Sequence, residues 1–410
     1  MAKILNISKD KMPILNGGSA MAFDILKKTA SILGTQELVA ISSSHTDSCL
    51  YFGESGLMFA KKLYDLGARV QVPTTTNVGS LDLLHPELIL SDEQTKKKSK
   101  ELLDCYLGFG CQPVYTCAPY QVSNRPALGD LCAWGESNAI AFTNSVLGAR
   151  TNRCGDFIDI CCALTGYAPY YGLLKEENRS PSIAVSLKNI SPNLQKQKIF
   201  FPLLGALVGR LAQNKIPIII DHAMENNEDG LKALGAAAAS TGAVGLFHIS
   251  NITPEADKYI NANNLEVIEI SKDMLNAEWS YLGVGEIGEQ VDCVALGSPH
   301  FSYEEFEELA SLLPTKPFAI PFYVCTSRFV YRMLEDKGVL EKILACGITI
   351  VQDTCVVVTP ILKDIRGVLM TNSGKFANYS LPNTGYRSVF GSLSDCVQSA
   401  IKGKLINDRL

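Results

Sequence analysis

Short apolar runs alternate with helical segments along the second half of the chain. The predicted strands cover residues 216–220, 244–249, 292–296, 318–324 and 348–353, and the predicted helices cover 228–240, 303–313 and 327–345. Apolar strands separated by helices of this length are typical of βαβ units and parallel sheets. The pattern therefore predicts an α/β fold.

The first part of the chain, to about residue 180, shows the same alternation with more turn residues. The pattern predicts helices at 19–33 and 54–66, with strands at 38–41 and 68–73. A polar stretch at 174–198 brackets a single strand and favours a boundary there. We expect two α/β lobes, at 1–185 and 186–410.

Composition indicates an ordinary globular protein, because hydrophobic residues make up 47% and charged residues 19% of the 410 positions. The net charge of -5 and the absence of a basic stripe argue against a nucleic-acid partner. The most apolar stretch, 199–212, is shorter than the roughly 20 residues that span a bilayer. It predicts a buried helix and no membrane partner. Without an export signal, we expect a cytoplasmic protein whose thirteen cysteines stay reduced.

Polar loops follow six of the predicted strands, where α/β proteins bind their ligands. These loops are SSSHTDSCLYFGESG, PTTTNVGS, TCAPYQ, HISNITPEA, GSPHFS and QDTCVVV. Their number predicts one shared site built from many loops. No P-loop, H-E-x-x-H or C-x-x-C motif occurs, which disfavours nucleotide-phosphate, zinc-protease and zinc-ribbon chemistry. A cysteine protease would need a histidine beside its nucleophile, and the spacing of His45, His248 and His300 selects no pair.

Three cysteines, Cys49, Cys117 and Cys355, lie in polar loops just after predicted strands, which makes them candidates for a metal site. Ordinary packing stays the alternative, because free cysteine is a common core residue. Packing is the default for the cysteines inside helical or strand patterns: Cys105, Cys132, Cys161, Cys162, Cys293, Cys325, Cys346 and Cys396.

Several long stretches resemble the aconitase X family, a branch of the aconitase superfamily of hydro-lyases. They include HTDSCLYFGESG, VPTTTNVGSLDLLHP, TCAPYQ, AWGESNAIAFTNSVLGARTNR, GDFIDICCALTG, FHISNITPEA, GSPHFS, QDTC and TNSGKFANY. They occur in order from about residue 15 to 400. The resemblance implies an aconitase-like large subunit of parallel and mixed sheets flanked by helices, without the swivelling domain.

The resemblance also implies iron, often in an iron–sulfur cluster, held by three cysteines from separate loops. TCAPYQ and QDTC match two of these positions, which assigns Cys117 and Cys355. Where many archaeal members have G-C-P-H, this chain has GSPH, with Ser298 in place of cysteine. Cys49 lies in a loop that resembles the bacterial branch, so we expect it to be the third ligand. The alternative is a cluster with two protein thiolates. We expect [2Fe–2S], with mononuclear iron or [4Fe–4S] as alternatives.

The bacterial branch implies dehydration of a small hydroxy acid, cis-3-hydroxy-L-proline, to 1-pyrroline-2-carboxylate. The alternatives are a phosphomevalonate dehydratase large subunit and a non-enzymatic iron-binding descendant. The resemblance further implies a small swivel-domain subunit as the partner that carries the base.

The remaining site candidates are polar residues of the matching loops. Guanidinium groups bind carboxylates in a bidentate manner, so Arg150 and Arg153, with Asn152 between them, are expected to hold the substrate carboxylate. A structural salt bridge to Asp156 or Glu136 is the alternative. We expect catalytic roles for His45, Glu136 and Lys375, and substrate contacts from Ser44, Asn77, Ser137, Asn138 and Ser298.

Overall fold

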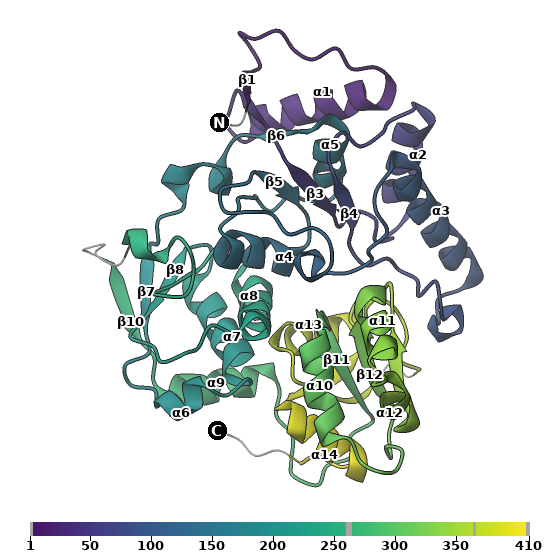
Figure 1. The fold of residues 1–410 in the computed structure, drawn as a ribbon, viewed down its shortest axis with the longest axis vertical. Helices are drawn as coiled ribbons and strands as arrows, with labels where there is room; N and C mark the ends of the chain where they lie inside the picture. Colours follow the sequence, from purple (N-terminus) through teal and green to yellow (C-terminus); the bar gives the residue numbers. More distant parts are fainter. Residues whose placement is uncertain (1–2, 260–264, 364–365, 407–410) are drawn as a thin grey trace. The chain divides into compact units, whose positions relative to one another are not determined.

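The computed structural model describes residues 3–259, 265–363 and 366–406 and forms two compact units (Figure 1). Unit 1 comprises Met1–Leu81, Ser91–Ser180 and Thr253–Glu255, and unit 2 comprises Asp82–Leu90, Pro181–Ile252 and Ala256–Leu410. The chain thus passes between the units several times. Among the described helices, none is long and apolar enough to cross a membrane.

Unit 1 contains two small sheets with helices packed around them. Strands β1 (Ile4–Asn6), β2 (Glu37–Ala40) and β6 (Tyr167–Pro169) form an antiparallel sheet, while β4 (Thr74–Thr76), β3 (Ser43–Thr46) and β5 (Cys132–Trp134) form a parallel one in that order. The helices are α1 (Gly17–Ile32), α2 (Glu54–Asp65), α3 (Glu93–Phe109), α4 (Ser137–Phe142) and α5 (Ile158–Thr165). Strand β3 reads Ser-Ser-His-Thr, and all four residues are buried. A buried polar strand is unusual, because buried polar groups need hydrogen-bond partners.

Unit 2 contains two fully parallel sheets, with strand orders β10-β7-β8-β9 and β13-β12-β11-β14-β15. The strands are β7 (Ile183–Ser186), β8 (Pro217–Ile220), β9 (His248–Ile249), β10 (Glu266–Glu269), β11 (Cys293–Phe301), β12 (Phe322–Thr326), β13 (Ile348–Val351), β14 (Gly367–Thr371) and β15 (Tyr386–Phe390). The helices are α6 (Pro192–Gln195), α7 (Phe200–Ala212), α8 (Glu228–Gly242), α9 (Lys272–Leu282), α10 (Tyr303–Leu312), α11 (Arg328–Asp336), α12 (Leu340–Ala345), α13 (Gly374–Thr384) and α14 (Leu393–Lys402).

Apolar side chains of neighbouring strands in the five-stranded sheet pack together in one hydrophobic core. They include Val294, Phe322, Val324 and Ile350. All nine residues of the central strand β11 are buried, as expected for a parallel strand covered on both faces. The chain adds β12 and β13 on one side of β11, and β14 and β15 on the other. Strand order therefore reverses beside β11, which is where open parallel sheets bind ligands.

The α/β prediction is confirmed, and α1, α2, β2 and α7 lie where the sequence pattern predicts them. Several predicted elements differ from the structure. The strand predicted at 244–249 is reduced to β9, His248–Ile249, and the one predicted at 318–324 begins only at Phe322. Residues 68–73 form no strand, because the backbone N–H groups of Val70 and Gln71 donate to carbonyls outside any sheet ladder, at 2.9 and 2.8 Å. The predicted helix at 327–345 is two helices, α11 and α12, separated at Gly338 with a positive φ of 69°.

Candidate functional site

The parallel sheet of unit 1 brings three polar strand ends together. Asp47 follows β3, Asn77 follows β4, and Glu136 lies two residues after β5. Parallel neighbours end at the same edge of a sheet, so these side chains meet. The Asn77 amide nitrogen donates to the carboxylates of both Asp47 and Glu136, the second at 2.9 Å. One amide thus joins two carboxyl groups at the sheet edge.

His45 lies inside β3 and is fully buried. Its Nδ1 lies 2.8 Å from the Thr75 hydroxyl, and no described atom is placed to hydrogen-bond its Nε2 or the Asn77 Oδ1. Burial lowers the pKa of His45 to about 4, although the nearby Glu136 carboxylate opposes this. The imidazole is therefore neutral at pH 7. The neighbouring Ser44 hydroxyl donates to the backbone of β5 at 2.7 Å, so it is used in holding the sheet.

Asp47 is an acid that sequence reasoning missed, although it stands in the conspicuous HTDSC loop. Burial raises its pKa to about 8, and the Glu136 carboxylate adds to the shift. The Asp159 carboxylate holds this loop in place, because it accepts hydrogen bonds from the Asp47 N–H at 2.7 Å and from the Ser48 hydroxyl at 2.6 Å. Asp47 thus keeps its proton at neutral pH and can donate it.

Cys49, in the same loop, has a buried thiol surrounded by backbone oxygens. It donates towards the carbonyls of Thr46 and Asn77, both at 3.5 Å, and of Val78 at 3.8 Å. Burial raises the pKa of Cys49 well above its usual value. This environment favours the neutral thiol over the thiolate.

Cys117 is also buried, and its loop is attached to the start of α4. The Asn138 amide donates to the Cys117 carbonyl at 2.7 Å. Glu136 caps the same helix by accepting from the Asn138 N–H and the Ser137 hydroxyl, both at 3.3 Å. Glu136, Ser137 and Asn138 therefore hold the Cys117 loop beside the Asp47–Asn77 group.

The three candidate residues of GARTNR, Arg150, Asn152 and Arg153, differ in what they can do. Arg150 pairs with Glu176 and lies 3.7 Å from Glu255, so its ion pairs involve neither Asp156 nor Glu136. The Asn152 amide bonds to two backbone groups at 2.9 and 2.8 Å. The Arg153 side chain is exposed. Of the three, Arg153 has the charge most accessible to a carboxylate.

In unit 2, four adjacent strands bring a second group of polar residues together. Ser298 lies in β11, Cys325 in β12, Cys355 four residues after β13, and Lys375 in the first turn of α13 after β14. The Cys325 thiol hydrogen-bonds the Cys355 sulfur and lowers the pKa of Cys355, and the Lys375 charge and the Ser298 hydroxyl add to this against the effect of burial. Three predicted site residues, Cys355, Ser298 and Lys375, thus lie together.

Both sulfurs of this group accept hydrogen bonds from the backbone. The Val356 N–H donates to Cys325 Sγ at 3.4 Å, and the Val357 N–H donates to the Cys355 sulfur. Sequence reasoning placed Cys325 in the core because it ends the apolar run FYVC. Its position at a strand end, like that of the other candidates, was the available signal.

The described residues contain no group of three His, Cys, Asp or Glu arranged to hold a metal ion. Cys49 and Cys117 belong to unit 1 and Cys355 to unit 2, so each thiol is assessed within its own unit. The donor chemistry in unit 2 fits iron, because soft sulfur ligands with N–H donors and a nearby cation suit the thiolate form. The surroundings of Cys49 do not favour that form.

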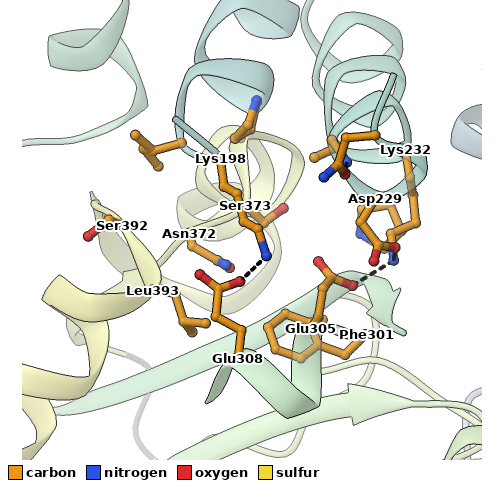
Figure 2. A pocket seen from close by; sticks show the side chains of 18 of the residues that line it. Lys198, Asp229, Lys232, Phe301, Glu305, Glu308, Asn372, Ser373, Ser392 and Leu393 are labelled. Carbon is orange, nitrogen blue, oxygen red and sulfur yellow. Dashed lines mark hydrogen bonds and ion pairs between the residues drawn. The ribbon is translucent and has the colours of Figure 1, made fainter. Parts of the chain in front are cut away.

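Ser298 also lines a cavity of about 400 Å³ in unit 2. Figure 2 shows its charged side chains, Lys198 paired with Glu308 and Lys232 paired with Glu305. Lys232 is also 2.8 Å from Asp229. The two lysines lining this cavity thus face three carboxylates, and the cavity carries no surplus of positive side-chain charge.

A G-x-G-x-x-G spacing occurs at Gly283, Gly285 and Gly288. It follows helix α9 and leads into β11, whereas a dinucleotide-binding loop follows a strand and opens a helix. The context therefore gives no support to dinucleotide binding.

Comparison with known families matches nearly the whole chain. Models described as aconitase X first, second and third domain match residues 6–177, 181–280 and 291–402. A solved structure of Thermococcus kodakaraensis aconitase X (holo-form) has a TM-score of 0.82 and 31% identity, covering 93% of this chain and 95% of that one.

Curated relatives carry two names. A cis-3-hydroxy-L-proline dehydratase of Hypocrea jecorina is 38% identical over 93% of this chain and 65% of its own length. One of Pseudomonas aeruginosa is 36% identical over 94% of this chain and 67% of its own length. A phosphomevalonate dehydratase large subunit of Thermococcus kodakarensis is 34% identical over 91% of this chain and 94% of its own length. The chain therefore spans about two thirds of the first two relatives and nearly all of the third.

Proposed function

The chain belongs to the aconitase X family, and we propose that it is an iron-dependent hydro-lyase that dehydrates cis-3-hydroxy-L-proline to 1-pyrroline-2-carboxylate. The two relatives with this name are 38% and 36% identical to it, against 34% for the phosphomevalonate dehydratase large subunit.

The observation that carries the proposal is the group formed by Asp47, Asn77 and Glu136 in unit 1, in which Asp47 is half-buried and the other two are buried. Dehydration expels a hydroxyl group, which needs a proton as it leaves. Asp47 keeps its proton to a pKa of about 8 and can donate it to that oxygen. The amide of Asn77 holds the carboxyls of Asp47 and Glu136 in place. The neutral His45 can hydrogen-bond the substrate through Nε2.

Cys117, Cys355 and a third thiolate, for which the sequence offers Cys49, are the residues proposed to hold iron, which would supply a Lewis acid for the departing hydroxyl. The [2Fe–2S] form stays the preferred prediction. Lys375 beside Cys355 offsets part of the thiolate charge. Arg153, with an exposed guanidinium, is the proposed partner of the substrate carboxylate.

The base that removes the α-proton is proposed to come from a small swivel-domain subunit. Support comes from the relatives named as large subunits of phosphomevalonate dehydratase, among them the one of Thermococcus kodakarensis. We expect this subunit to close over the site and exclude water.

Phosphomevalonate is the second candidate substrate, because large subunits of phosphomevalonate dehydratase match this chain nearly end to end. A phosphate group requires surplus positive charge. The described unit 2 cavity, with two lysines against three carboxylates, offers no such surplus.

Anaerobic assay with both substrates tests the proposal. The chain is co-expressed with a candidate swivel-domain small subunit, and product is followed by NMR. We expect pyrroline carboxylate from cis-3-hydroxy-L-proline and no product from phosphomevalonate. The reverse result makes the chain a phosphomevalonate dehydratase subunit. An iron-loaded complex inactive on both supports the non-enzymatic descendant. An Arg153→Met variant should raise KM by about tenfold, the worth of one charged contact.

A further inference from the structure

We infer that Arg179 and Glu255 are positioning residues, whose buried ion pair sets the backbone from which Arg153 reaches the substrate. The inference deepens the proposed function and rests on the role proposed there for Arg153, which is to bind the substrate carboxylate. It concerns residues 149–153, here called the arginine segment, and the groups that hold this segment belong to unit 1.

The arginine segment extends the parallel sheet of unit 1 beyond β5. Trp134 of β5 pairs in parallel with Arg153 on one side and with His45 of β3 on the other. The Cys132 N–H also donates to the Arg150 carbonyl at 2.8 Å. Neighbouring strands are about 4.8 Å apart, which puts the Arg153 backbone roughly 10 Å from that of His45. Arg153 therefore starts from the sheet edge at which the acid group of unit 1 lies.

A side-chain amide holds the side of the arginine segment that faces away from β5. Asn144 lies in the π-helix Thr143–Leu147, which Gly148 separates from the segment. Its amide nitrogen donates to the Thr151 carbonyl at 2.9 Å, and its amide oxygen accepts from the Thr151 N–H at 3.0 Å. A π-helix is rare and often occurs at a functional site. One side chain thus binds both backbone groups of Thr151 and fixes the segment against β5.

Arg179 holds this amide in place. Its side chain is fully buried, and its guanidinium donates to the side-chain and backbone oxygens of Asn144 at 3.1 and 2.9 Å. It also donates to the carbonyls of Ala149 and Leu173, at 3.3 and 3.0 Å. A guanidinium has five N–H donors in one rigid plane, which an ammonium group lacks. Arg179 thus fixes the π-helix and the start of the arginine segment relative to each other.

Glu255 balances the charge of Arg179 and connects it to the segment. The Arg179 Nε–H donates to the Glu255 carboxylate at 2.8 Å, and both side chains are buried. The same carboxylate lies 3.7 Å from the guanidinium of Arg150, within the arginine segment. Glu255 comes from HISNITPEA, one of the polar loops that the sequence pattern assigns to a shared site. Its carboxylate contacts two arginines that anchor the segment, so this loop contributes to the site through Arg153.

Loosening of the arginine segment should weaken substrate binding more than it slows the chemical step. Arg153 is exposed, so a shift of its backbone moves the charge that meets the carboxylate. The acid group is held by other contacts, which come from Asn77 and Asp159. A change at Arg179 should therefore raise KM and leave kcat almost unchanged, which is the pattern for an interaction made equally in the ground state and the transition state.

Arg179→Lys tests the inference, because lysine keeps the charge that faces Glu255 but lacks the planar fork. Variants are assayed on cis-3-hydroxy-L-proline in the iron-loaded complex with the small subunit. We expect KM to rise about tenfold, as for Arg153→Met, with kcat within about twofold of the wild type. The matched control is Arg210→Lys, which makes the same change in the ion pair with Glu278 in unit 2. It should leave both constants unchanged.

The double variant Arg179→Lys/Arg153→Met separates positioning from a general loosening of the fold. If Arg179 acts through Arg153, the two changes are not additive, and KM of the double variant should equal that of Arg153→Met. Hydrogen exchange gives a second readout. Arg179→Lys should exchange faster than the wild type in residues 149–153 and at the wild-type rate in β3.

A folded Arg179→Lys protein with wild-type KM, beside Arg153→Met with a raised KM, overturns the inference and leaves the proposed function intact. Multiplying KM effects in the double variant, or a loss confined to kcat, overturn it as well. An unchanged KM in Arg153→Met removes the role of Arg153, and the inference with it. A wild-type complex that is inactive on this substrate contradicts the proposed function itself, on which the inference rests.

Asn144→Asp carries the same test if Arg179→Lys does not fold. Aspartate keeps an oxygen that can accept from Arg179 but loses the amide N–H that donates to the Thr151 carbonyl. We expect the same rise in KM with kcat preserved. A folded Asn144→Asp protein with wild-type KM contradicts the inference.

Discussion

Cys49 in unit 1 and Cys355 in unit 2 both follow the carboxyl end of a parallel strand, and both side chains are buried. Their surroundings are nevertheless opposite. Carbonyl oxygens surround Cys49, and burial raises its pKa. The Cys355 sulfur accepts hydrogen bonds from the Cys325 thiol and the Val357 N–H, and Lys375 is a nearby positive charge; all three lower the pKa of Cys355. Position at a strand end thus identifies candidates, while the polarity of the surrounding backbone decides which form of the sulfur is stable.

The same comparison extends to the neighbouring groups. In unit 1, the protonated carboxyl of Asp47 and the hydrogen-bonded carboxyl of Glu136 lie near the neutral imidazole of His45. Unit 2 gathers sulfurs beside a lysine. The first arrangement suits proton donation and the second suits a soft metal.

The largest expected effect is on iron binding by Cys355→Ala. Removing a proposed ligand should lower iron affinity by more than about 100-fold, since loss of a supporting contact alone costs 10–100-fold. Competition with a chelator under anaerobic conditions measures it, with Cys293→Ala, which removes a buried thiol of β11 in the same sheet, as the control. Equal iron affinities in both variants would show that Cys355 is not an iron ligand.

Asn77→Ala tests how unit 1 holds its acids. The amide is a shared donor to Asp47 and Glu136, so its loss leaves a buried and a half-buried carboxyl without their common donor. We expect the free energy of unfolding to fall by about 2–3 kcal/mol in denaturant titrations. Asn189→Ala, which removes an exposed amide–carboxylate contact with Glu269, is the control and should change it by less than about 0.5 kcal/mol. Similar losses in both would show that the Asn77 contacts are ordinary.

His45 should make the stability of the protein depend on pH. Its folded pKa of about 4 lies below the usual 6.5, so its contribution is present above pH 6.5 and is lost as pH falls towards 4. Between pH 7 and pH 5 the wild type should lose about 2 kcal/mol through this group. Unfolding curves of His45→Gln at the two pH values should lack that part of the loss. The more exposed His85→Gln serves as control, and a wild-type slope in His45→Gln would mean that its imidazole titrates normally.

Lys375→Gln is expected to have the smallest effect of the four. Removing a cation near Cys355 should weaken iron binding about tenfold, as for other supporting contacts of metal ligands. Chelator competition measures this, with Lys198→Gln as a lysine control in the same unit. Unchanged affinity would assign the stabilisation of the Cys355 thiolate to its hydrogen bonds rather than to the lysine charge.

Sequence pattern alone determined the α/β class, the helices α1, α2 and α7, and the placement of polar loops at strand ends, because periodicity and burial are local properties of the chain. The family resemblance is likewise confirmed. The strand prediction at 68–73 is wrong because composition alone does not decide which hydrogen bonds form. These residues have a strand-like composition, but the N–H groups of Val70 and Gln71 donate to carbonyls near helix ends.

Tertiary structure alone decided how each candidate side chain is partnered. Cys325 resembled a core residue because it ends an apolar run, yet its sulfur meets the N–H of Val356, 31 positions along the chain. Arg150 finds its carboxylates at Glu176 and Glu255, the second far away in sequence. The charge state of a buried group depends on its hydrogen-bond donors and neighbouring charges. Folding brings these from distant segments, so only the tertiary structure could separate thiol from thiolate.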